Sequence, residues 1–142
     1  GLRRSEGINL DVNDILLKEK RVYVRKGKNY KERYVPMTEA VKDDLENYIY
    51  VAREKIRSFK NTKPEALSLS MQVKRLCGNA LIRRIHKLAE SAGIQKEIGL
   101  HTLRHSIATH LLQSGMTLEE VKQFLGHSSL ESTQIYTHLA NE

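Results

Sequence analysis

The clearest helical signal in the sequence is His101-Thr102-Leu103-Arg104-His105-Ser106-Ile107-Ala108-Thr109-His110-Leu111-Leu112-Gln113-Ser114. Apolar side chains recur in it every four residues, at Leu103, Ile107 and Leu111, which is the spacing of one face of a helix. Gly115 comes next and can end a helix, because glycine adopts the left-handed conformation without strain. The stretch therefore predicts a helix over residues 101–114 with an apolar face.

Two further helices are expected after this stretch. Thr117 and Glu120 have the spacing of a capping box, which favours the start of a short helix that ends at Gly126. A last helix is predicted for residues 129–138. The C-terminal part of the chain is therefore expected to be largely helical.

The chain ahead of residue 101 contains two longer helical segments. Thr38 can cap a helix that runs through about Arg57, and another helix runs to about Ala92, where Gly93 stops it. Residues 58–72 contain a proline and several serines, which indicates a loop or a short strand. The apolar positions of the first of these helices predict one inward face, made of Val41, Leu45, Tyr48, Ile49, Ala52 and Ile56.

Two short segments rich in β-branched and aromatic residues lie before these helices. Residues 21–25 and 33–36 each favour a strand, and residues 27–30 separate them. We therefore expect a β-hairpin with a basic tip, preceded by one or two helical turns around residues 2–8. Together the elements predict an α+β domain that is mainly α-helical, with a small antiparallel β-hairpin or sheet.

Positive charge is concentrated around this hairpin. The whole chain carries 24 Lys and Arg against 17 Asp and Glu, a net charge of +7. Residues 18–33 hold eight of the basic residues and two acidic ones, which leaves +6 in this stretch. Such a concentration favours a polyanionic partner such as nucleic acid. A lysine-rich strand edge also deters aggregation, so charge alone leaves both interpretations open.

Length and composition restrict the class of protein. A chain of 142 residues fits one domain, and the single cysteine, Cys77, excludes an internal disulfide. No apolar run approaches the roughly 18 residues that a membrane span needs, so we expect a soluble, intracellular protein with no signal peptide. The chain begins at Gly1 without an initiator methionine, and we expect it to be a fragment of a longer protein.

Five short segments gain meaning when they are taken together. They are Gly1-Leu2-Arg3-Arg4-Ser5-Glu6, Lys28 ahead of Lys31-Glu32-Arg33-Tyr34-Val35-Pro36, His101-Thr102-Leu103-Arg104-His105-Ser106, Leu125-Gly126-His127-Ser128, and Tyr136. Each is a weak signal alone. Their order, with Tyr136 nine residues after His127, resembles the catalytic domain of the tyrosine recombinases, the phage integrase family.

The resemblance implies a phosphate clamp built from two arginines. Arg3 and Arg104 occupy the arginine positions of the family, and the register of the first segment favours Arg3 over its neighbour Arg4. A guanidinium fork suits this role because it presents parallel donors to two phosphate oxygens and stays charged. His127 would donate a hydrogen bond to a phosphate oxygen of the same group.

The resemblance also implies the parts of a strand-cleaving reaction. Tyr136 would attack the scissile phosphate and form a 3′-phosphotyrosine, with His101 as the general base that accepts its proton. Lys28 would protonate the departing 5′ oxygen. The family hairpin usually has glycine after its lysine, whereas Asn29 stands here, and Lys26 remains an alternative to Lys28.

Domain organisation and partners follow from the same resemblance. Residues 1–142 would be the catalytic domain of a site-specific recombinase or integrase of a mobile element, with the N-terminal core-binding domain absent. The expected partner is double-stranded DNA at specific recombination sites, contacted through Lys26, Lys31 and Arg33. The full-length enzyme is expected to act as a homo-tetramer in the cytoplasm, associated with the nucleoid, while the fragment itself can be monomeric. We expect no membrane association, no cofactor and no metal.

Three other interpretations compete with this one. His101 and His105 have the spacing of zinc ligands on a helix, but Thr102 stands where a zinc protease has its glutamate. Residues 117–136 resemble a non-catalytic helix-turn-helix DNA-binding module, which leaves Arg3 and Arg104 without a role. A type IB topoisomerase uses similar chemistry without strand exchange, and the sequence does not exclude it.

Overall fold

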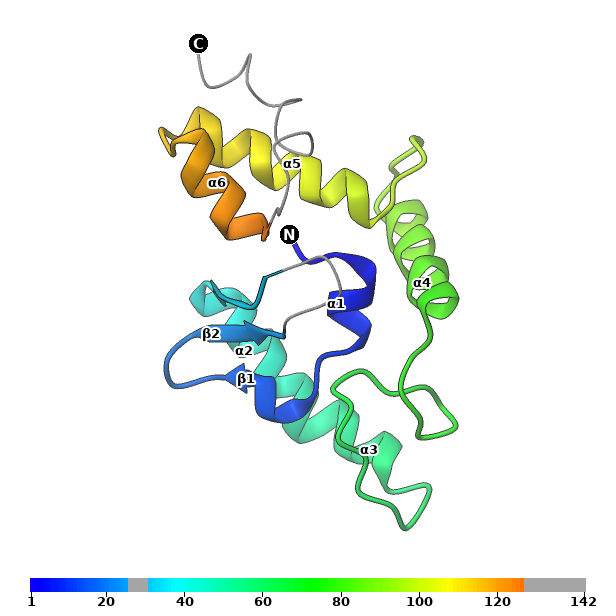
Figure 1. Ribbon diagram of the computed structural model, residues 1–142. Coiled ribbons are helices and arrows are strands. Elements are labelled where there is room, and N and C mark those ends of the chain that lie inside the picture. The colour runs from blue at the N-terminus through cyan, green and yellow to red at the C-terminus, as the bar shows by residue number, and fades with distance from the viewer. Residues whose placement is uncertain (26–30, 127–142) are drawn as a thin grey trace. The chain divides into compact units, whose positions relative to one another are not determined.

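The computed structural model describes residues 1–25 and 31–126, which fold into two compact units (Figure 1). Of these described residues, the first unit contains residues 1–4, 25, 31–33 and 82–126. The second unit contains residues 5–24 and 34–81. The predicted hairpin tip, residues 27–30, and the predicted last helix, residues 129–138, lie outside the described residues.

The described residues are mainly helical with a small sheet, so the predicted fold class is confirmed. The helices are α1 (Arg4–Ile8), the 3₁₀ turn η1 (Val12–Asp14), α2 (Glu39–Asn47), the π turn η2 (Tyr48–Ala52), α3 (Arg53–Arg57), α4 (Gly78–Ser91), α5 (Leu100–Gln113) and α6 (Leu118–Leu125). The strands are β1 (Ile15–Leu16), β2 (Arg21–Val24) and β3 (Arg33–Pro36). No helix in residues 1–25 and 31–126 has the length and apolar character required to cross a membrane.

The ends of the helices follow the capping signals of the sequence. The Thr117 hydroxyl accepts a hydrogen bond from the Glu120 N–H at 3.1 Å, and the Glu120 carboxylate accepts one from the Thr117 N–H at 3.2 Å. Thr38 caps α2 in the same way, accepting from the Val41 N–H at 3.3 Å. Gly93 ends α4 with φ +76°, and the predicted helix boundaries are confirmed there.

The predicted helix over residues 38–57 contains a π turn, η2, in its middle. A π turn adds one residue to a helical turn, so the apolar face does not continue at the predicted spacing. Ile49 is buried as predicted, but Val41 and Ala52 are exposed, and the prediction of one continuous inward face is wrong at those two positions. Arg53 is buried instead.

Buried polar contacts fix the irregular segment 64–69 in the second unit. The Arg53 guanidinium donates to the carbonyl oxygens of Pro64 at 2.6 Å and Ala66 at 2.8 Å. The Tyr48 hydroxyl accepts a hydrogen bond from the Leu69 N–H at 3.1 Å. Buried backbone groups need such partners, and Tyr48 at the start of η2 and Arg53 just after its end supply them.

The sheet has the strand order β1-β2-β3. β1 pairs antiparallel with β2, with Ile15 opposite Val22. β1 was not predicted, because two residues carry no recognisable alternation. The Tyr23 and Tyr34 rings, one from each hairpin strand, lie 5.3 Å apart, and the Arg21 guanidinium lies 4.5 Å from the centre of the Tyr34 ring.

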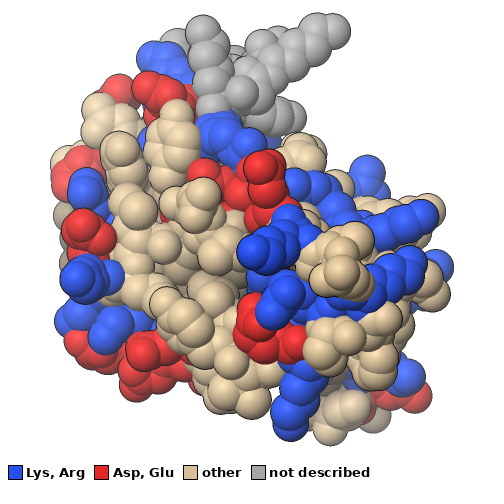
Figure 2. Space-filling view, turned by 90° about the horizontal axis from the view of Figure 1, so that it is seen from below, with Lys and Arg blue, Asp and Glu red and all other residues tan. Residues whose placement is uncertain are grey.

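Surface charge in the second unit is partly paired. On the face shown in Figure 2, Lys and Arg side chains and Asp and Glu side chains are interspersed with uncharged residues. Arg57 donates to the Glu54 carboxylate at 2.7 Å and lowers the pKa of that carboxyl below its ordinary value. Exposed pairs of this kind contribute little to stability.

In the first unit, helices α5 and α6 pack against each other (Figure 1). Their buried cluster consists of Ala108, Leu112, Val121 and Leu125. Ile107 and Leu111 pack against this cluster as predicted, but Leu103 is 47% exposed, and its predicted inward position is wrong. Helix α6 has eight residues and spans about 12 Å, whereas the fourteen residues of α5 span about 21 Å. In Figure 1 the first turn of α5 extends past the end of α6, and Leu103 in that turn is not part of the buried cluster.

Candidate functional site

The C-terminal end of α6 is the starting point of the site. A helix end leaves its last carbonyl oxygens without helical partners and carries partial negative charge. Gly126 ends α6 with φ +71°, a conformation that favours glycine, and its N–H donates to the carbonyls of Gln123 and Lys122. The carbonyls of Phe124, Leu125 and Gly126 then accept hydrogen bonds from arginine side chains.

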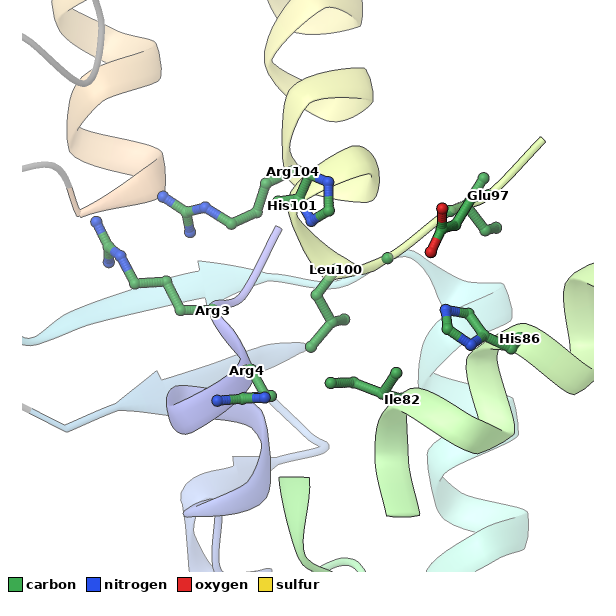
Figure 3. A pocket seen from close by; sticks show the side chains of 10 residues that line it. Arg3, Arg4, Ile82, His86, Glu97, Leu100, His101 and Arg104 are labelled. Carbon is green, nitrogen blue, oxygen red and sulfur yellow. The ribbon is translucent and has the colours of Figure 1, made fainter. Parts of the chain in front are cut away.

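Arg3 and Arg104 meet at this helix end. Arg3 donates through Nη1 to the Leu125 carbonyl at 3.2 Å and through Nη2 to the Gly126 carbonyl at 3.3 Å. Arg104 donates through Nη2 to the same Leu125 carbonyl at 3.2 Å and through Nη1 to the Gly1 carbonyl at 2.5 Å. Both side chains extend toward the end of α6 in Figure 3. Two guanidinium groups therefore share one carbonyl oxygen.

Arg4, the alternative to Arg3, is oriented differently. It is exposed, and its side chain extends away from the Arg3 and Arg104 guanidinium groups in Figure 3. Arg3 is half-buried, as is Arg104. The arrangement thus places Arg3 beside Arg104, as the sequence register predicts, although their function at a phosphate stays a prediction.

His101 lies in the first turn of α5, three residues before Arg104, and is exposed. Its ring sits against Gly99, where an added Cβ would lie 3.2 Å from the imidazole Cε1 and Nδ1. The Thr102 hydroxyl accepts a hydrogen bond from the Gly99 N–H at 3.2 Å and fixes the start of the helix. An imidazole can accept or donate a proton, and the role of His101 as a general base stays a prediction.

A pocket of about 740 Å³ opens beside these residues, entirely within the first unit. Its lining is made of Arg3, Arg4, Ile82, His86, Glu97, Ile98, Gly99, Leu100, His101 and Arg104. Figure 3 shows His86 and Glu97 at the side of the pocket away from the arginine pair. Basic groups outnumber the single carboxylate, which favours an anionic ligand.

The sequence did not single out His86 and Glu97. His86 lies on α4 four residues after Ile82, and nothing in that spacing distinguishes it from any exposed helix residue. Glu97 lies in the turn between α4 and α5. Their place in the pocket arises from tertiary contacts that no local pattern records.

The remaining predicted site residues are divided between described and undescribed segments. Lys31 is exposed ahead of β3, and Arg33 is half-buried. Lys26, Lys28, His127 and Tyr136 lie outside the described residues. Within residues 1–25 and 31–126, no three His, Cys, Asp or Glu side chains are grouped to hold a metal ion.

The arrangement of Arg3 and Arg104 suits the phosphate clamp that the sequence predicts. Two adjacent guanidinium forks match the oxygens of a phosphodiester, and a charged phosphate is a stronger acceptor than a neutral carbonyl. The carbonyls of α6 hold both forks at one place before any ligand arrives. Such preorganised donors can stabilise the charge that develops on a phosphate during its transfer.

Three comparisons place the chain among known proteins. It is 42% identical to the tyrosine recombinase XerD of Oceanobacillus iheyensis, over 98% of this chain and 46% of that protein. The crystal structure of XerA recombinase matches with a TM-score of 0.82 and 36% identity, over 96% of this chain and 48% of that one. XerH site-specific recombinase, bound to its difH substrate in a pre-cleavage complex, matches with a TM-score of 0.75 and 30% identity, over 96% of this chain and 39% of that one.

These relatives are longer than the chain, which spans about half the length of the curated relatives it matches. The profile of the phage integrase family matches residues 1–142. The match covers both compact units and every predicted site residue. The chain belongs to the phage integrase family, that of the tyrosine recombinases.

Proposed function

We propose that the chain is the catalytic domain of a site-specific DNA recombinase, which cuts and rejoins DNA through a covalent bond to Tyr136. The observation that carries the proposal is the pair Arg3 and Arg104, which share the Leu125 carbonyl beside His101. Their two guanidinium groups bring positive charge to one place, which favours an anionic ligand there. Membership of the family supports the same reaction.

The proposed reaction needs no external energy. The Tyr136 hydroxyl attacks the phosphorus, its proton passes to His101, and a bond to phosphorus replaces the bond to the 5′ oxygen. Lys28 gives a proton to the departing 5′ oxygen. Attack by the 5′ hydroxyl of another strand reverses these steps and releases the tyrosine. Arg3 and Arg104 hold the non-bridging oxygens throughout.

We further propose that the two units act together as one domain over residues 1–142, because one family profile spans them. Double-stranded DNA is the proposed partner, and the relative XerH binds a DNA substrate. The complete enzyme would work as a tetramer in the cytoplasm on the DNA of the nucleoid. The helix-turn-helix interpretation gains no support, since it gives no role to the arginine pair.

The direct test is covalent capture of DNA by the complete protein. A nicked duplex carrying its recombination site is incubated with the protein, and the products are separated under denaturing conditions. We expect a protein–DNA adduct that also forms in excess chelator, because the clamp consists of arginine and histidine side chains. Loss of the adduct in chelator, with recovery on adding magnesium or zinc, would contradict this mechanism.

A second expectation concerns the basic hairpin, where +6 of charge lies in residues 18–33. Replacing Lys26, Lys28 and Lys31 with alanine together should weaken DNA binding. The magnitude of the slope of log affinity against log salt concentration should decrease by about 0.9 for each lost phosphate contact on duplex DNA. Binding measured from 50 to 200 mM salt checks this, and an unchanged slope would show that the hairpin does not contact the backbone.

A further inference from the structure

Arg33 joins the row of arginines at the end of α6. It donates through Nε to the Phe124 carbonyl at 2.8 Å, in the residue before the carbonyl that Arg3 and Arg104 share. Residues 33 and 124 are 91 positions apart, so this contact ties a strand end to the last turn of the helix. Arg33 is half-buried, whereas the neighbouring Lys31 and Glu32 are exposed.

The Arg33 side chain occupies the space next to Gly126, where any other residue would have its Cβ. A Cβ built on Gly126 would lie 2.7 Å from Arg33 Nη1 and 3.0 Å from its Cζ. A distance this short requires the guanidinium to shift, and we expect the shift to disturb its hydrogen bond to the Phe124 carbonyl. Glycine therefore suits position 126 for two reasons. It adopts the φ of +71° without strain, and it has no Cβ that would contact the Arg33 guanidinium.

We propose that Arg33 is a positioning residue, which holds the last turn of α6 where the Leu125 and Gly126 carbonyls orient Arg3 and Arg104. The proposal rests on the proposed function of that clamp. Arg33 acts through the helix end and does not itself touch the phosphate. The guanidinium fork fits this role because it donates in a fixed direction.

This role differs measurably from the DNA contact that the sequence predicts for Arg33. A residue that binds backbone phosphate contributes to affinity and to its salt dependence. A residue that positions the clamp contributes to the rate of cleavage on DNA that is already bound, because small misplacements of reacting groups are costly. A variant of Arg33 that changes the cleavage rate on bound DNA but not the salt dependence of binding therefore indicates positioning, and the reverse indicates a DNA contact.

The first experiment compares Arg33→Ala with Lys31→Ala in the complete protein on a nicked duplex carrying its recombination site. For Arg33→Ala we expect adduct formation at saturating DNA to slow by about 10- to 100-fold, with the salt slope of binding unchanged. Lys31→Ala should reduce the magnitude of the slope of log affinity against log salt concentration by about 0.9. An unchanged rate for Arg33→Ala, or a lower slope with a normal rate at saturation, would overturn the proposal.

The second experiment uses glycines matched in backbone conformation. Gly126→Ala should slow adduct formation as Arg33→Ala does, and the double variant should be no slower than the slower single variant. Gly93→Ala is the control, because Gly93 also has a positive φ, +76°, but an added Cβ there meets no atom within 4 Å. Equal rates for Gly126→Ala and Gly93→Ala, or additive effects in the double variant, would count against the proposal.

A third measurement is independent of catalysis. The Nε–H resonances of Arg3 and Arg104 are recorded without DNA, and thermal unfolding verifies that each variant is folded. Arg33→Ala should shift both resonances, while Lys31→Ala leaves them in place. Unshifted resonances would refute the positioning role. If the parent protein forms no adduct but the resonances shift, the proposed function fails while the contact network stands.

Discussion

The variant Tyr136→Phe is expected to form no covalent adduct with DNA and to bind DNA about as well as the parent. The substitution removes only the hydroxyl that is proposed to attack phosphorus and keeps the aromatic ring. The clamp of Arg3 and Arg104 is untouched, so affinity should change by no more than one hydrogen bond, about 0.5–1.5 kcal/mol. Denaturing electrophoresis measures the adduct, and a binding titration of the same nicked site measures affinity.

An adduct formed by Tyr136→Phe would eliminate Tyr136 as the nucleophile. The five other tyrosines, at positions 23, 30, 34, 48 and 50, would then be tested in turn. Tyr48 serves as a built-in comparison, because its hydroxyl accepts a hydrogen bond from the Leu69 N–H within the second unit. Tyr48→Phe should therefore affect thermal stability and leave the covalent adduct in place.

The second large effect is expected for Arg104→Ala. Loss of one preorganised donor to a developing negative charge costs on the order of 10²- to 10³-fold in rate. Stability should fall much less, because the Leu125 carbonyl keeps its hydrogen bond from Arg3 and the Gly1 carbonyl lies at an exposed position. The rate of adduct formation at saturating DNA and the midpoint of thermal unfolding test the two parts.

Two further variants control this experiment. Arg104→Lys keeps the charge but loses the fork, so we expect only partial recovery of the rate. Arg57→Ala removes an arginine that is bound to Glu54 in the second unit and should leave the cleavage rate unchanged. Equal rates for Arg104→Ala and the parent protein would remove Arg104 from the clamp.

Local signals in the sequence predicted the helix ends. Thr117 with Glu120, and the glycines at 93 and 126, act within a few residues of themselves, and the structure has the caps and left-handed turns where they were expected. The buried face of each helix was harder to predict, because the burial of a side chain depends on which other element packs against it. Leu103 has the right spacing but extends past the short helix α6, and Ala52 falls in a π turn that shifts the face.

The site was predicted through the family resemblance and not through local physics. Arg3 and Arg104 were selected by their motifs, but their shared contact with Leu125 is a tertiary fact that no spacing contains. The same holds for Arg33: its contact with DNA stays a prediction, and the hydrogen bond from its Nε to the Phe124 carbonyl was not foreseen. A hydrogen bond from a side chain to a backbone atom far away in the sequence produces no periodic pattern from which it could be predicted.

The separation between Arg3 and its partners has a consequence for synthesis of the protein. Arg3 and the Leu125 carbonyl are 122 positions apart in the sequence. Their contact is therefore a long-range one, which forms only when a long loop of chain has closed. The chain is synthesised in sequence order, so Arg3 leaves the ribosome before α6 is made. A prematurely terminated chain would carry Arg3 and the basic residues 18–33 without the helix end that pairs the two arginines. Translation products that end before α6 are therefore expected to lack the paired arrangement of the two arginines.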